Sequence, residues 1–103
     1  MSYTTIDFER DIRDILNICH DDLAAIDEGE KRQATKEQIE GTIIPEMNTL
    51  LEMIRKQELP EKNRRWLLSE AYITRGWNWD IMSNDELNIK LPRLCYKYQH
   101  TLD

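Results

Sequence analysis

Residues 8–26, FERDIRDILNICHDDLAAI, carry the clearest structural signal in the chain. Apolar side chains recur there at the i, i+4, i+7, i+8 and i+11 spacing of one helical face. Thr4 or Thr5 can cap the start of this helix, and Gly29 can end it. The sequence therefore predicts a long amphipathic first helix, with an apolar stripe made of Phe8, Ile12, Ile15, Leu16, Cys19, Leu23 and Ile26.

A second helix is predicted after the polar loop at 27–34. Thr35 and Gln38 form a capping box, and helical spacing of apolar residues continues to about residue 57. Pro45 lies inside this segment, four residues after Gly41. Because proline lacks an N–H and crowds the preceding turn, we expect a kink or a break near Ile44.

Two more helices are predicted in the second half of the chain. Pro60 is well placed as the first residue of one, and Gly76 as its left-handed stop. A second capping box, Ser83 to Glu86, opens the last helix, which contains Pro92. The prediction is an all-α fold: residues 1–103 form one compact bundle of four helical segments, or up to six if Pro45 and Pro92 break their helices.

Composition indicates a soluble protein of one domain. The chain has 103 residues, of which 40% are hydrophobic and 33% charged, and no apolar run approaches the roughly 20 residues that span a bilayer. The N-terminus has no signal-peptide pattern. Cys19 and Cys95 both fall on apolar stripes, so we expect buried, reduced thiols in a cytoplasmic protein, with no membrane partner.

The negative charge is concentrated in the first part of the chain. The formal net charge is −6; residues 1–41 hold 11 acidic and 5 basic residues, whereas the rest hold 9 of each. Such a surface repels phosphate backbones and attracts basic partners. The sequence therefore argues against nucleic acid as a ligand.

Acidic residues of the first helix gather on one arc beside the apolar stripe. At 100° per residue this arc contains Asp7, Asp11, Asp14, Asp21 and Asp22, with Ile18 in its middle. An exposed isoleucine ringed by carboxylates could bind a basic protein surface. The alternatives are an ordinary solvated face, or burial of Ile18 by another helix.

Two of the three tryptophans lie in the stretch RGWNWD, residues 75–80. If a helix ends at Gly76, Trp77 can contact Tyr72, and Trp79 can lie on the same side. We expect both indoles to cover the end of the small core. A partner-facing hot spot is the alternative.

No metal, cofactor or catalytic constellation is expected. Cys19, His20, Cys95 and His100 lack the spacing of a zinc site. Residues 93–100, RLCYKYQH, resemble in spacing alone the R-x(4–6)-H motif of HEPN-class helical ribonucleases, in which a polar residue usually follows the arginine, whereas Leu94 follows it here. An HEPN-like ribonuclease is therefore the third functional hypothesis, with Arg93 and His100 as its candidate residues.

The chain as a whole resembles the small cytoplasmic immunity proteins that bacteria pair with secreted or contact-delivered toxins. The resemblance is one of size, charge and texture, and it is carried by the acidic first helix and by residues 47–80, with Leu59-Pro60 and Trp77-Asn78-Trp79. It implies a protein that is no enzyme and that binds and neutralises a cognate toxin, often a basic nuclease domain. A helical adaptor or regulatory subunit of a non-toxin complex is the alternative, and we expect a monomer or weak dimer. The predicted partner-binding residues are Asp11, Asp14, Ile18, Asp21, Asp22, Asp27, Glu28 and Glu30.

Overall fold

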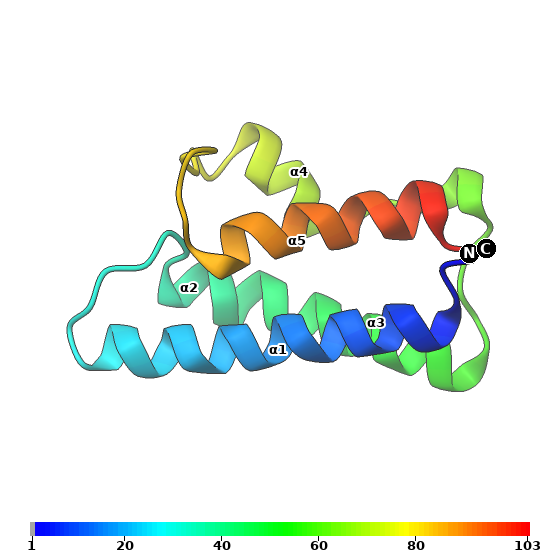
Figure 1. The fold of residues 1–103 in the computed structure, drawn as a ribbon, viewed down its shortest axis with the longest axis horizontal. Helices are drawn as coiled ribbons and strands as arrows, with labels where there is room; N and C mark the ends of the chain where they lie inside the picture. Colours follow the sequence, from blue (N-terminus) through cyan, green and yellow to red (C-terminus); the bar gives the residue numbers. More distant parts are fainter. Residues whose placement is uncertain (1) are drawn as a thin grey trace.

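The structure, a computed structural model, describes residues 2–103 and is all-α, as predicted (Figure 1). Neighbouring segments in the chain join into four helices, and residues 2–103 contain no strand. Within the same residues, no helix is both long and apolar enough to cross a membrane. The segments are α1 (Thr5–Asp27), α2 (Lys36–Gln38), η1 (Ile39–Ile43), α3 (Ile44–Lys56), η2 (Lys62–Arg64), α4 (Leu68–Arg75), α5 (Glu86–Tyr96) and η3 (Lys97–Thr101).

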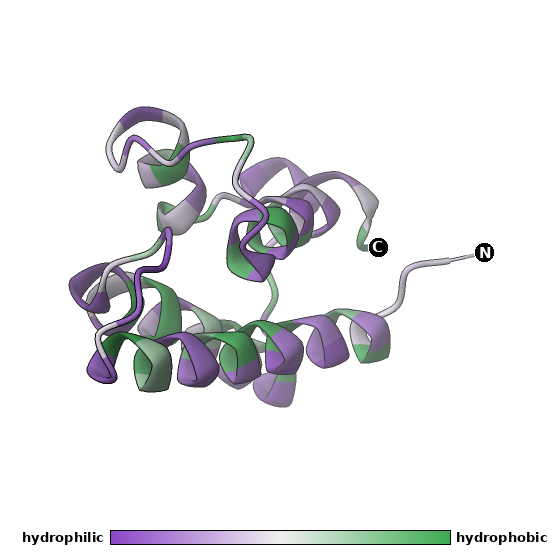
Figure 2. Cartoon of the chain, turned by 60° about the vertical axis from the view of Figure 1, so that its left-hand side comes forward, coloured by the Kyte–Doolittle hydropathy of each residue, from purple (hydrophilic) through white to green (hydrophobic). Residues whose placement is uncertain are grey.

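Helix α1 runs along most of the molecule and begins and ends with the predicted caps. Thr4 and Asp7 form a reciprocal capping box at its start. Gly29 has a φ of 89° at its end, where its N–H donates to Ile26 and the Glu30 N–H donates to Ala25. These two bonds are those of a Schellman ending. Figure 1 shows α1 antiparallel to both α3 and α5, and Figure 2 shows apolar and polar residues alternating along it.

Neither proline divides its helix, so the bundle keeps four helices. η1, immediately before Pro45, is a π-helical turn in which the Ile44 N–H donates to Ile39. This wider turn relieves the crowding that a proline imposes on the preceding carbonyls, and the chain stays helical through to Lys56. Helix α5 likewise continues through Pro92 and ends in a second π turn, η3.

The start of the third helix differs from the prediction. Pro60 does not open it: a short 3₁₀ turn, η2, follows, and α4 begins only at Leu68. No local side chain caps α4; instead the Glu46 carboxylate of α3 accepts the N–H groups of Leu68 (2.6 Å) and Ser69 (2.9 Å). Local sequence cannot show a cap supplied from another helix.

The predicted signals at either side of the α4–α5 loop are also corrected. Gly76 ends α4 with a φ of −126°, so it is not left-handed; Asn78, with a φ of 55°, is. Ser83 does not cap α5, which begins at Glu86. Asp85 precedes that helix, and its carboxylate accepts the Gln33 N–H at 2.5 Å.

The core lies between α1, α3 and α5. Both cysteines are buried in it as free thiols, as predicted. Phe8 stacks on Tyr98 with ring centroids 5.2 Å apart. Trp79 is buried, as predicted, and its indole N–H donates to the Gln38 side chain at 2.9 Å.

The predicted contact of Trp77 with Tyr72 is also present. The rings of Trp77 and Trp79 lie 5.3 Å apart, so both indoles lie on the same side, and Trp77 is partly buried. By contrast, Trp66 points outward and is 66% exposed, while its neighbour Leu67 is buried.

Candidate protein-binding surface

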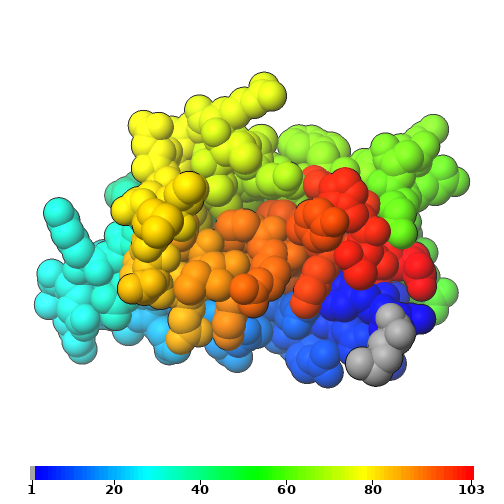
Figure 3. Space-filling model, turned by 45° about the horizontal axis from the view of Figure 1, so that its top comes forward, coloured from blue at the N-terminus to red at the C-terminus, as the bar shows by residue number. Residues whose placement is uncertain are grey.

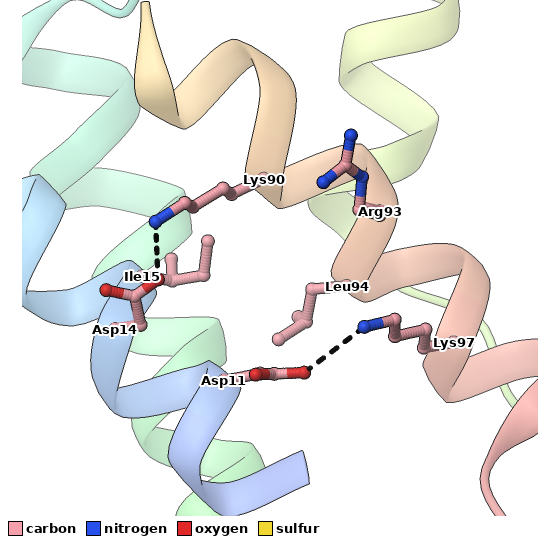
Figure 4. A pocket seen from close by; sticks show the side chains of 7 residues that line it. All are labelled: Asp11, Asp14, Ile15, Lys90, Arg93, Leu94 and Lys97. Atoms are coloured by element: carbon pink, nitrogen blue, oxygen red, sulfur yellow. Dashed lines mark hydrogen bonds and ion pairs between the residues drawn. The ribbon is translucent and has the colours of Figure 1, made fainter. Parts of the chain in front are cut away.

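The central acids of α1 face α5, where they form ion pairs. Lys90 Nζ lies 3.0 Å from Asp14 Oδ2, and Lys97 Nζ lies 3.7 Å from Asp11 Oδ2 (Figure 4). The Tyr3 hydroxyl donates to the same oxygen of Asp11 at 2.5 Å. Basic residues from the second half of the chain therefore neutralise this part of the predicted acidic face.

These pairs line a shallow groove of about 140 Å³ between α1 and α5. Its apolar floor is formed by Ile15 and Leu94, and Arg93 stands at its edge (Figure 4). The hydrogen bond from Lys90 to Asp14 raises the pKa of the lysine, so Lys90 stays charged at neutral pH. Two carboxylates and three cations are nearly balanced here, so this groove does not offer a partner a strong field.

Ile18 is buried, which corrects its predicted role as an exposed contact. Only 7% of its surface is exposed. The physical reason is that α1 packs against two helices, α3 and α5, and so buries a wider stripe than one neighbour would cover. The alternative of burial by another helix is therefore the correct one.

Asp22 is also buried, with 8% of its surface exposed. Its Oδ1 lies 3.3 Å from Arg32 Nε, whereas its Oδ2 has no hydrogen-bond partner among residues 2–103. Burial raises the pKa of this carboxyl, Arg32 lowers it, and Asp85 and Asp21 raise it further. Asp22 is thus a buried carboxylate of which only one oxygen has a partner within the described residues, and burying such a group costs free energy.

Asp22 lines a second depression, which we call the acidic hollow. It has a volume of about 290 Å³ and lies between the C-terminal half of α1 and the start of α5. Asn84, Asp85 and Glu86 line one side of it, although the pattern of residues 83–86, SNDE, indicates only a helix cap. The hollow is lined by Ile18, Asp21, Asp22, Arg32, Asn84, Asp85 and Glu86.

The remaining predicted contacts lie at the same end of the molecule and are exposed. Asp27 and Glu28 are at the end of α1, and Glu30 follows in the loop, 3.3 Å from Arg32. Within residues 2–103, Asp21, Asp27 and Glu28 make no ion pair within 4.0 Å. The structure therefore separates the predicted site into a centre paired with lysines and an end where Arg32 pairs with Asp22 and Glu30, while Asp21, Asp27 and Glu28 make no ion pair among residues 2–103.

Arg93 and His100 do not line a common depression among those described. The His100 ring packs beside Tyr96, with centroids 4.8 Å apart. The two residues are seven positions apart, about 10 Å along the helix axis, and the ribonuclease hypothesis stays a prediction. Within residues 2–103, no group of three or more His, Cys, Asp or Glu residues is placed to hold a metal ion.

A comparison of the chain with protein-family models, curated proteins and solved structures finds no match. The functional conclusion therefore depends on the geometry and charge of the residues themselves.

Proposed function

We propose that this protein binds and neutralises a basic protein toxin, as immunity proteins do. The observation that carries the proposal is the uneven compensation of its acidic residues: the centre of α1 is paired with lysines, while the end that includes Asp21, Asp27 and Glu28 is not. Unpaired surface charge of one sign speeds encounter with a partner of the opposite sign. Fast association suits an inhibitor that must meet its target before damage is done.

The proposal is tested by affinity capture of the tagged protein from its native cells, followed by an activity assay of whatever is retained. We expect a basic protein in a stoichiometric ratio, released by moderate salt because exposed charges are screened. Addition of this protein in equimolar amount should abolish the partner's toxic activity. Recovery of the chain alone would refute the proposal, and a partner that keeps its activity when bound would favour the adaptor alternative.

A further inference from the structure

The acidic hollow carries an excess of negative charge. Asp21, Asp22, Asp85 and Glu86 contribute four carboxylates, and Arg32 is the only cation in its lining. Lys90 lies 3.4 Å from Glu86 but does not line the hollow. Carboxylates form strong, charge-assisted hydrogen bonds with ammonium and guanidinium groups, so the chemistry of the hollow suits such a cation.

Asp22 is the buried carboxylate of the hollow, and it is only partly compensated within the fold. One of its carboxylate oxygens is buried without a partner, and a buried charged acceptor that lacks a hydrogen bond costs stability. Arg32 does not resolve this, because it pairs with the other oxygen and is shared with Glu30. A cationic donor that entered beside Arg32 would compensate the excess charge.

The loop beside the hollow carries two exposed apolar side chains on a backbone that is held by hydrogen bonds. Asp80 organises it: its N–H donates to the Gln33 side chain (3.1 Å), its carboxylate accepts the Met82 N–H (2.9 Å), and its carbonyl accepts from Asn88 (3.1 Å). Ile81 and Met82 are nevertheless 87% and 80% exposed. A rigid loop with an apolar tip loses little entropy when it binds.

The tip and the hollow are close neighbours. Consecutive Cα atoms are about 3.8 Å apart, so the Cα atom of Met82 lies within about 8 Å of that of Asn84, which lines the hollow. Figure 3 shows this loop on the surface, at the same end of the molecule as the loop that follows α1. An apolar anchor bordered by charged groups matches the apolar centre and polar rim of a protein interface.

We infer that the acidic hollow receives a lysine or arginine side chain of a protein partner, and that Ile81 and Met82 pack on apolar surface beside that side chain. This inference rests on the proposed function and assigns its contact surface. It replaces the predicted contacts Asp11, Asp14 and Ile18, which are paired or buried, with residues of the α4–α5 loop and the start of α5.

The first experiment needs no partner. ¹⁵N-labelled protein is titrated with N-acetyl-arginine N-methylamide and, separately, with the citrulline analogue, which has nearly the same shape but no charge. We expect saturable amide shifts at Asp21, Asp22 and Asp85 with the arginine compound only. No saturable shift, or equal shifts with both compounds, would overturn the inference.

Matched variants then locate the charge that matters. D21N/E86Q removes two carboxylates from the hollow, and E58Q/E61Q removes two exposed carboxylates from the segment between α3 and η2, which runs beside the start of α1. Both variants have the same net charge, so any difference between them is local. The arginine-induced shifts should be lost in D21N/E86Q and kept in E58Q/E61Q; shifts that persist in D21N/E86Q would overturn the inference.

The captured partner provides the second experiment and separates this inference from the proposed function. We expect its affinity to fall tenfold or more in D21N/E86Q and in I81S/M82S, and less than twofold in E58Q/E61Q. Equal affinity for all variants would leave the proposed function standing and refute this surface. If wild-type protein captures no partner, the proposed function is refuted, and with it the assignment of a protein ligand to the hollow.

Discussion

Glu46 connects α3 to α4, and its replacement gives the sharpest test of how the third helix is held. Its two carboxylate oxygens accept the N–H groups of Leu68 and Ser69, the first two residues of α4. This helix has only 8 residues and no local cap, so its positive end depends on a carboxylate from another helix. Short helices of this kind are marginal without tertiary support.

The expected loss follows from these two bonds. Gln keeps the shape but loses the charge and can accept only one N–H, because its amide nitrogen is a donor; we expect E46Q to lower the free energy of unfolding by about 1 kcal/mol. Ala removes both acceptors, and we expect E46A to lower it by about 2 kcal/mol. For a domain near this size, 1 kcal/mol corresponds to roughly 4 °C in Tm.

Urea denaturation and amide hydrogen exchange measure the effect. The amides of Leu68 and Ser69 should lose protection more than those of α1, because α4 opens locally before the bundle unfolds. E58Q is the control, since Glu58 is exposed and makes no ion pair among residues 2–103. If E46A matches E58Q in stability and in the exchange of these two amides, the cap contributes nothing and the argument is wrong.

Further predictions concern the end of α1, the core thiols and the acidic hollow. G29A should cost about 1 kcal/mol by urea denaturation, because Gly29 has a φ of 89° and no atom lies near enough to clash with a new Cβ. Burial raises the pKa of Cys19 to about 12 and also raises that of Cys95, so neither thiol should react with a disulfide reagent until the protein is unfolded. I18A should lower the free energy of unfolding by about 2–4 kcal/mol, as expected for a core residue. A loss below about 0.5 kcal/mol would show that Ile18 is exposed. Burial raises the pKa of Asp22 above 3.8, so folding favours its protonated form. The contribution of Asp22 to the free energy of unfolding therefore falls as the pH rises from 3.8 through the raised pKa. D22N should therefore be more stable than wild type at neutral pH, with the difference shrinking toward pH 3.8, and an equal difference at both pH values would contradict this sign.

The features that sequence predicted well are those that depend on near neighbours in the chain. The apolar period of α1 and the caps formed by Thr4, Thr35 and Gly29 involve residues a few positions apart, and the structure confirms them. The fold class follows from the same local patterns. Pro45 was recognised as a disturbance, but the π turn that absorbs it is a small backbone change without a sequence signature of its own.

Other missed features involve partners far apart in the chain, in addition to the local signals at Pro60, Gly76 and Ser83 that the structure does not follow. Lys90 lies 76 residues from Asp14, and the Asp85 carboxylate accepts an N–H 52 residues away. Helical periodicity gives the direction of a side chain around its own helix, but not which other helix covers that direction. Periodicity placed the acidic arc on α1, but the exposure of Ile18 was wrong because α1 packs against both α3 and α5.

The ion pairs of Asp11 and Asp14 with lysines of the last helix affect how charge is distributed over the whole molecule. Once their charges are cancelled in the middle, the excess negative charge lies at one end, near residues 21–30 and the α4–α5 loop, whereas at the other end Lys62 and Arg64 of η2 offset Glu58 and Glu61 (Figure 1). The protein therefore has a permanent dipole moment along its 40 Å axis. In the field of a cationic surface, this dipole experiences a torque before any contact is made, so the molecule rotates its acidic end forward as it approaches.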